Sequence, residues 1–307
     1  MWQRHAVPPT LRPADRGDLA AIVAVYADYD LANRGAVDSG EDDVLRDWEA
    51  PGFPMHERTR VLVDDGGEVV GYAVASPGGD ADSVARPGRG GDDALLGWLE
   101  SLGEPLRHHL PASDDEGSAR MGRRGWVADR TYWRMRIDLD GPAPTPPPAW
   151  PDGYTSTALD VERHGPAVHE LIQTAFADIG DDQPREEYGP WAAWALAPGR
   201  YDPDLCRVVA RRDGTVVAAD VCHLSGDAGF VRQLAVAAAA RGRGLGLALL
   251  HDVFRHARDR GLAAVELGVD RANATGAPRL YERAGMRVTE AFTRWRWTPA
   301  ERIDGPR

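Results

Sequence analysis

Apolar and polar residues follow their clearest periodic pattern between positions 230 and 297. Residues 230–236 place Leu234 and Val236 on one face, which predicts a strand. The next segment predicts an amphipathic helix, because its apolar residues recur every three or four positions. These residues are Leu245, Leu249, Leu250, Val253, Phe254 and Ala257. Residues 263–269 and 286–297 predict two further strands, so this part of the chain belongs to the α/β class.

A glycine-rich turn, residues 241–246 (Arg-Gly-Arg-Gly-Leu-Gly), joins the first strand to the helix. The first turn of a helix has unpaired N–H groups and the positive end of the helix dipole, and glycine lets a bulky anion approach the backbone. The turn therefore predicts a site for a phosphate or pyrophosphate. It is not a Rossmann fingerprint, because its glycines are not spaced G-x-G-x-x-G, and it is not a P-loop, because the chain contains no lysine.

Two further features follow this turn in the chain. Asn273 comes after the second strand, and a short helix carries Leu-Tyr-Glu-Arg-Ala-Gly at residues 280–285, with Thr275 as its expected cap. Together with R-x-x-G-x-G, this order resembles the GNAT superfamily of acetyl-CoA-dependent N-acetyltransferases over residues 154–299. The resemblance implies a mixed α/β fold with a mostly antiparallel sheet flanked by helices, and acetyl-CoA as cosubstrate.

The resemblance also implies where acetyl-CoA lies. Backbone N–H groups would hold the pyrophosphate, from residues Arg243, Gly244, Leu245, Gly246, Leu247 and Ala248. Arg241 would open the loop and supply charge. Main-chain groups of Leu234, Ala235 and Val236 would pair with pantetheine, and the Asn273 side chain would bond the pantetheine arm.

Tyr281 is the expected catalytic residue. A phenol with a pKa near 10 can protonate a departing CoA thiolate, whose thiol has a pKa near 8.5. Tyr281 could instead only pack its helix onto the sheet. The general base stays open among Asp220, His223 and Glu266, or no base is needed if the pocket lowers the pKa of the amine.

Composition limits the partners. The chain has 307 residues, enough for two domains, and a net charge of −12, which argues against a nucleic-acid partner and favours a cationic one. No signal peptide and no apolar run of membrane-spanning length are found, so a cytoplasmic protein without a membrane partner is expected. Cys206 and Cys222 are expected as buried free thiols, and no residue cluster has the spacing of metal ligands.

The chain repeats itself on either side of a proline-rich segment, residues 141–153, which is expected to be an extended linker. Residues 121–136 align with residues 281–296 at an offset of 160, and 69–73 align with 216–220 at an offset of 147. We therefore expect two GNAT folds in tandem, at residues 1–140 and 154–307.

The first half is expected to be a degenerate pseudo-domain that does not bind acetyl-CoA. Residues 76–87 contain no apolar run like that of residues 230–236, so the corresponding strand is expected to be missing. Pro87 stands in the place of Arg241, which removes a backbone donor. Asp92 stands in the place of Gly246, which puts a carboxylate near the pyrophosphate. Met121 stands in the place of Tyr281.

The segment after the first helix of the second half is the expected acceptor site. Its carboxylates and aromatic rings would suit a cationic amine, and the candidates are Asp178, Asp181, Asp182, Glu187 and Trp191. The alternative is a solvated acidic loop with its tryptophans in the core.

The predicted function is direct transfer of acetyl from acetyl-CoA to the primary amine of a small molecule, by a monomer or homodimer. The two-domain layout also resembles that of mycothiol synthases, which acetylate a small amino-sugar conjugate. The alternatives are a peptide or protein N-terminal acetyltransferase, and a non-catalytic protein that binds acyl-CoA or sequesters a small molecule.

Overall fold

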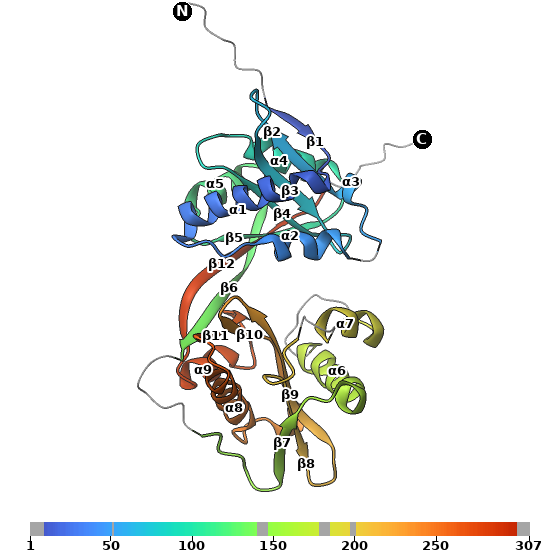
Figure 1. Ribbon diagram of the computed structural model, residues 1–307, viewed down its shortest axis with the longest axis vertical. Helices are drawn as coiled ribbons and strands as arrows, with labels where there is room; N and C mark the ends of the chain where they lie inside the picture. Colours follow the sequence, from blue (N-terminus) through green and yellow to red (C-terminus); the bar gives the residue numbers. More distant parts are fainter. Residues whose placement is uncertain (1–8, 51, 140–146, 178–184, 197–200, 300–307) are drawn as a thin grey trace, which may run out of the picture. The chain divides into compact units, whose positions relative to one another are not determined.

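The computed structural model describes residues 9–50, 52–139, 147–177, 185–196 and 201–299 (Figure 1). The chain forms two compact units. The first unit contains residues 1–131 and 291–307, and the second contains residues 132–290. Each unit is a mixed α/β fold, as predicted, and each is described by itself below.

In the first unit, strands that are consecutive in the sequence are also neighbours in the sheet. The elements are β1 (Thr10–Arg12), α1 (Leu19–Arg34), α2 (Glu41–Trp48), α3 (Met55–Arg58), β2 (Thr59–Val63), β3 (Val69–Ala75), β4 (Asp80–Ala85), α4 (Asp92–Ser101), β5 (Leu106–Pro111) and α5 (Asp115–Arg123). The sheet order is β1-β2-β3-β4-β5, with β4 and β5 parallel and the other pairs antiparallel.

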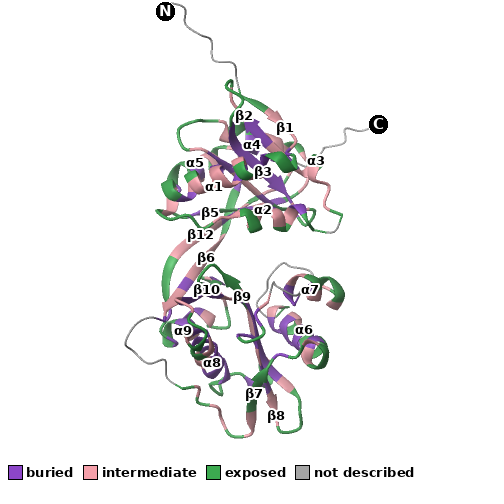
Figure 2. Cartoon of the chain, in the orientation of Figure 1, coloured by how far each residue is buried: buried purple, intermediate pink, exposed green. Residues whose placement is uncertain are grey.

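The central strand β3 of this unit is buried along its whole length, because helices cover both of its faces (Figure 2). Adjacent residues of β2 show the two sides. Val61 packs in one apolar cluster with Ile22 of α1, whereas Leu62 packs in another with Leu95 of α4. The alternation of side chains across a strand therefore separates the core into two layers.

Strand β4 corrects one expectation. The polar stretch between residues 76 and 87 was expected to lack a strand, but residues 80–85 form β4, which pairs with β3 over five residues. Only Ala81, Val84 and Ala85 are buried. Backbone pairing with β3 thus stabilises β4 in an extended conformation that the β4 side chains do not predict, since pairing with a neighbouring strand often overrides the intrinsic preference of a segment.

The second unit contains the predicted strand, helix and strand series. Its elements are β7 (Tyr154–Ala158), α6 (Val161–Ala177), α7 (Tyr188–Ala195), β8 (Arg207–Arg211), β9 (Val216–Ser225), β10 (Ala228–Val236), α8 (Leu245–Asp259), β11 (Ala264–Asp270) and α9 (Ala277–Arg283). Strands β7 to β10 are antiparallel, and β10 and β11 are parallel. The predicted strands, the helix and its apolar face are confirmed: Leu249, Val253 and Phe254 of α8 are fully buried.

Two long strands, β6 (Val127–Asp138) and β12 (Arg287–Trp297), run from one unit into the other. Residues 132–138 of β6 pair with β11 of the second unit, and residues 292–297 of β12 pair with β5 of the first. In the first unit Arg294, which is 3% exposed, binds Asp129. The halves thus exchange their last strands.

This exchange places the division of the chain differently from the sequence prediction, which set it at residues 141–153. The compact units divide within β6 and β12 instead. Residues 140–146 of the predicted linker lie outside the described part of the chain. A linker composition marks where the repeat begins again, but it carries no information on which half each terminal strand joins.

Candidate active site

The glycine-rich turn lies between β10 and α8, as predicted. Gly242 and Gly244 have φ angles of 75° and 81°, a region that only glycine enters easily. Gly244 is the N-cap of α8 and offers no side chain to the free amides of the first turn. The Arg241 Nε donates to the carbonyl of Val236 at 3.0 Å, so this side chain closes the loop onto the end of β10.

The hydrogen bonds in the first turn of α8 show which of the predicted pyrophosphate donors have free amides. The amide of Ala248 donates to the carbonyl of Gly244 at 3.0 Å. Ala248 is therefore committed to the helix, which corrects its expected role as a phosphate donor. The amides of Leu245, Gly246 and Leu247 precede the first intrahelical bond and remain directed at the turn.

Gly246 has a packing role that the motif alone does not reveal. A Cβ added at this position would lie 2.9 Å from the Leu280 Cδ2 of α9. Gly246 thus lets α9, which carries Tyr281, approach α8 closely.

Strands β10 and β11 separate beyond their first few residues. They pair only from Ala228 to Val231 on β10, and the register of β10 with β9 shifts between Val231 and Gln233. Leu234, Ala235 and Val236 pair with β9 on one side. Among the described strands none pairs with their other edge, so main-chain groups there are available to an extended ligand such as pantetheine.

Tyr281 lies on α9 in the apolar cluster that includes Ala235 of β10 and Val269 of β11. The residue is 8% exposed, and burial raises the pKa of its phenol to about 12. Within the described residues its hydroxyl has no hydrogen-bond partner. A protonated phenol is thus held beside the opening between β10 and β11.

Asn273 stabilises the turn before α9. Its Oδ1 accepts from the Thr275 amide at 2.9 Å and from the Thr275 hydroxyl at 2.6 Å, which leaves the Asn273 Nδ2 for a ligand. Thr275 was expected to cap α9, but the N-cap is Gly276 and no side chain caps the helix. Thr275 lies one residue before the N-cap, and its hydroxyl donates to Asn273 instead.

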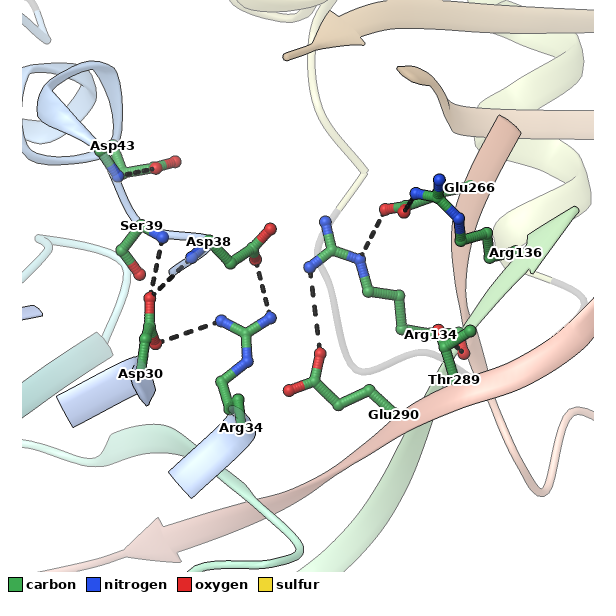
Figure 3. A network of polar contacts seen from close by, with 11 residues as sticks. Asp30, Arg34, Asp38, Ser39, Asp43, Arg134, Arg136, Glu266, Thr289 and Glu290 are labelled. Atoms are coloured by element: carbon green, nitrogen blue, oxygen red, sulfur yellow. Dashed lines mark hydrogen bonds and ion pairs between the residues drawn. The ribbon is translucent and has the colours of Figure 1, made fainter. Parts of the chain in front are cut away.

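The three candidate bases differ in accessibility. Asp220 is fully buried, and burial raises the pKa of its carboxyl to about 8. His223 lies with its Nε2 3.3 Å from the carbonyl of Ala195. Glu266 is bound by Arg134 at 2.9 Å and by Arg136 at 2.6 Å, as Figure 3 shows. One guanidinium group binds each of its two oxygens, so neither oxygen is left open to an amine.

The acidic candidates for the acceptor lie partly outside the described residues, which exclude Asp178, Asp181 and Asp182. Glu187 is exposed at the N-terminus of α7. Trp191, in contrast, is fully buried, and its Nε1 donates to Gln233 Oε1 at 3.0 Å. Trp191 therefore belongs to the core and is not a surface contact for an acceptor, because its apolar ring packs on His169 of α6.

Sequence reasoning missed a pair of residues beside the glycine turn. Arg211 and Arg212, at the tight turn between β8 and β9, line two cavities of about 870 and 530 Å³. The larger cavity also contains Arg241, and the smaller contains Arg243. The offset of 147 between the halves, extended by a few residues, would have drawn attention to these positions.

Comparisons with known proteins agree with this geometry. Residues 166–286 match the Acetyltransferase (GNAT) family. The chain is 34% identical to a mycothiol acetyltransferase of Thermobispora bispora, over 76% of this chain and 80% of that protein. It is 30% identical to a mycothiol acetyltransferase of a Parafrankia species, over 93% and 97% of the two chains.

Solved structures extend the similarity to the whole chain. A GCN5-related N-acetyltransferase from Sphaerobacter thermophilus is 28% identical and superposes with a TM-score of 0.82, over 97% of this chain and 98% of that one. A tandem GNAT protein from the clavulanic acid biosynthesis pathway shares the fold, with a TM-score of 0.71 at 19% identity, over 98% of both chains.

The fold and the site thus define an acyltransferase with acetyl-CoA as its acetyl donor. The chain belongs to the GNAT acetyltransferase family, and its relatives include tandem GNAT proteins. In the described part of the chain, no helix is both long and apolar enough to cross a membrane. No cluster of three or more His, Cys, Asp or Glu residues there has the arrangement of a metal site.

Proposed function

We propose that the second unit transfers acetyl directly from acetyl-CoA to the primary amine of a small molecule, within one ternary complex. The observation that carries this proposal is the opening between β10 and β11. The glycine turn lies at the end of β10, and the Tyr281 ring packs in the cluster that lines both strands. A cofactor bound by the turn could extend along the free edge of β10 and present its thioester near the phenol.

The residues around the opening would act on each stage of the transfer. The free amine attacks the carbonyl carbon, and backbone N–H groups of β10 stabilise the negative charge that develops on oxygen. The C–S bond then breaks, and the Tyr281 hydroxyl donates a hydrogen bond to the departing sulfur. Because its pKa is about 12, the phenol stays protonated at neutral pH. Full proton transfer to a thiolate is then uphill, so we assign Tyr281 to stabilising the thiolate by a hydrogen bond, while the proton that the attacking nitrogen loses passes to solvent water.

We propose an acceptor of the mycothiol type, namely the amine that acetylation converts into mycothiol. The names of relatives at 30–34% identity support this assignment. A cationic acceptor is supported by the net charge of −12 and by the exposed Glu187. Asp178, Asp181 and Asp182 are proposed to add to this attraction.

We propose further that the first unit does not bind acetyl-CoA. Its equivalent turn, residues 86–91, has both arginines neutralised: Arg86 pairs with Asp28 and Glu68, and Arg89 pairs with Glu68. Asp92 pairs with Arg120 at the start of α4. A phosphate would therefore have to displace carboxylates that already occupy the guanidinium groups.

An acetyl-CoA consumption assay over a panel of amines tests the proposal. The panel includes the amine precursor of mycothiol, amino sugars, polyamines, amino acids and peptides. We expect the mycothiol precursor to give the highest kcat/KM. Preference for peptides would indicate an N-terminal acetyltransferase instead. Tight acetyl-CoA binding without turnover on any amine would indicate a non-catalytic acyl-CoA-binding protein.

The cationic character of the acceptor has its own test. Asp181→Asn, Asp182→Asn and Glu187→Gln together should raise the acceptor KM and flatten its salt dependence, because exposed charges act over only about 8 Å at physiological salt. Glu186 is left unchanged, since its carboxylate accepts from the Trp194 Nε1 at 2.9 Å. An unchanged KM and salt slope would instead point to an uncharged acceptor.

A further inference from the structure

The tight turns between β2 and β3 in the first unit and between β8 and β9 in the second have the same backbone. The Gly67 amide donates to the carbonyl of Asp64 at 3.0 Å, and the Gly214 amide donates to that of Arg211 at 2.9 Å. Gly67 and Gly214 have φ angles of 84° and 85°. The two turns are therefore structurally equivalent at the sequence offset of 147.

Their side chains have opposite charge. The first turn carries Asp64 and Asp65, whereas the equivalent positions of the second carry Arg211 and Arg212. Asp64 also has a local role in the first turn, because its Oδ1 accepts the amides of Gly66 and Glu68, each at 2.9 Å. In the second turn Asp213 accepts a backbone amide instead, from Thr215 at 2.9 Å, so Arg211 and Arg212 are not needed for the turn itself. What these two arginines face is therefore the relevant difference between the halves.

The first unit shows what such a turn faces. Arg89 of the glycine loop reaches across to the β2–β3 turn, where its guanidinium lies 3.2 Å from Glu68 and 3.9 Å from Asp64. Arg89 is the equivalent of Arg243, because Gly88 and Gly90 on either side match Gly242 and Gly244 in sequence and in positive φ. The loop arginine and the turn thus form a closed ion pair in the first unit.

The second unit has the arginine of the loop but not the carboxylates of the turn. Arg211, Arg212 and Arg243 line one cavity of about 530 Å³. Within the described residues, none of these three side chains forms a salt bridge or hydrogen bond. A group of guanidinium ions that outnumber the nearby carboxylates favours an anionic ligand, and phosphate suits the fork of arginine.

The carboxylates around the cavities offset only part of this charge, since the smaller cavity has three arginines, Arg211, Arg212 and Arg243, against two aspartates, Asp152 and Asp213. Asp213 accepts the Thr215 amide at 2.9 Å within the turn, and this bond holds the pKa of its carboxyl below its usual value. Asp152 is the other acidic residue of the smaller cavity. In the larger cavity Glu170 pairs with Arg185, while Arg163 adds a further positive charge.

We propose that Arg211 and Arg212 bind the 3′-phosphate of acetyl-CoA. This inference rests on the proposed function, in which the adjacent glycine turn holds the pyrophosphate. The 3′-phosphate and the pyrophosphate are attached to the same ribose, so the third phosphate must lie close to the loop. The β8–β9 turn supplies two cations that line the same cavities as Arg241 and Arg243 of the loop, and the anion takes the place that the carboxylates of the β2–β3 turn occupy in the first unit.

The test compares acetyl-CoA with acetyl-dephospho-CoA, which lacks only the 3′-phosphate. Calorimetry should show that the wild-type chain binds acetyl-CoA about tenfold to 100-fold more tightly, the range expected for hydrogen bonds between charged groups. The variant Arg211→Gln/Arg212→Gln should lose this preference and bind both compounds with the wild-type affinity for acetyl-dephospho-CoA. Arg211→Asp/Arg212→Asp, which restores the residues of the β2–β3 turn, should reverse it.

Arg123→Gln is the matched control, because Arg123 is an exposed arginine of the first unit outside both cavities. It should leave the preference unchanged. Equal wild-type affinity for the two compounds, or an equal loss for both in the Arg211/Arg212 variants, would overturn the inference alone. Binding of neither compound to the wild-type chain would overturn the proposed function as well.

Adenosine 3′,5′-bisphosphate identifies the source of the phosphate. It should compete with acetyl-CoA for one site, with an affinity that falls in the Arg211→Gln/Arg212→Gln variant. Binding to a chain already saturated with acetyl-CoA would show that the arginines serve a separate nucleotide, which contradicts the proposal.

Discussion

Burial decides the protonation state of two residues of the site, Tyr281 and Asp220. The ordinary pKa of tyrosine is 10.0, and burial raises that of Tyr281 to about 12. Burial also raises the pKa of Asp220 from 3.8 to about 8. Both groups are therefore held in their neutral forms, because a low-dielectric interior disfavours the charge.

Tyr281→Phe tests the catalytic role of the phenol. The substitution removes only the hydroxyl, so the ring still packs on α8 and the Kd for acetyl-CoA should stay nearly unchanged. The kcat should fall at least tenfold, since a hydrogen bond to a charged group contributes about 1.5–3 kcal/mol, and each 1.4 kcal/mol is about tenfold in rate. Steady-state kinetics and calorimetry measure the two quantities. Wild-type turnover in this variant would leave Tyr281 a packing role only.

Asp220→Asn tests the buried carboxyl through its effect on stability. The pKa of Asp220 is higher in the folded than in the unfolded chain, so folding takes up a proton above about pH 4. The stability that the neutral carboxyl contributes is therefore complete below about pH 4 and is lost as pH rises towards 8. The asparagine variant has no proton to take up. The unfolding free energy of the variant should therefore rise relative to that of the wild type as pH rises, by about 5 kcal/mol near pH 8. Denaturant curves that stay parallel from pH 4 to 8 would contradict this.

At the scale of elements, the loop between strand and helix has the same backbone in both halves but different charged neighbours. Both loops have glycines with positive φ at matching positions, so the backbone path is retained. The side chains around the path differ: carboxylates close the loop of the first unit, while arginines leave that of the second open to an anion. Electrostatics therefore distinguishes two loops of the same shape.

Gly244→Asp and Gly90→Asp form a matched pair that tests this difference. Both glycines have positive φ, and neither has an atom within 4 Å of an added Cβ, so the backbone strain is similar. Calorimetry on the wild type should give one acetyl-CoA per chain. Gly244→Asp should abolish binding, because a carboxylate repels the pyrophosphate, whereas Gly90→Asp should leave it unchanged. A wild-type stoichiometry of two would refute the pseudo-domain.

On the scale of the whole molecule, the exchange of β6 and β12 makes each unit dependent on a distant part of the sequence. The first unit is completed by residues 292–297, whose Trp295 and Trp297 pack against its core. Arg294 supplies the partner of Asp129 and holds the pKa of that carboxyl below its usual value. Residues 292–297 are thus structurally part of the first unit.

A chain that ends at Glu290 tests this dependence. It lacks the strand that pairs with β5, so amides of residues 107–112 should lose protection from hydrogen exchange and the first unit should melt at a lower temperature. A chain that ends at Pro299 is the control and should behave as the wild type. Undiminished protection of β5 in the shorter chain would show that the exchanged strand is dispensable.

The sequence by itself predicted the features that depend on neighbouring residues. The strand, the glycine turn and the amphipathic helix at residues 228–259 follow from local periodicity and from the unique backbone freedom of glycine. The internal repeat likewise predicted a second α/β unit, although not its strand β4. These inferences needed no knowledge of long-range contacts.

Only the tertiary structure decided the features that depend on residues far apart in the chain. Strand β4 pairs with β3, and Trp191 can be buried because Gln233, 42 positions later, satisfies its N–H within the core. The strand exchange and the cavity between Arg211 and Arg243 also arise between separate segments. Periodicity reports which face of an element is apolar, but not which partner covers it, and that choice depends on the packing of the whole chain.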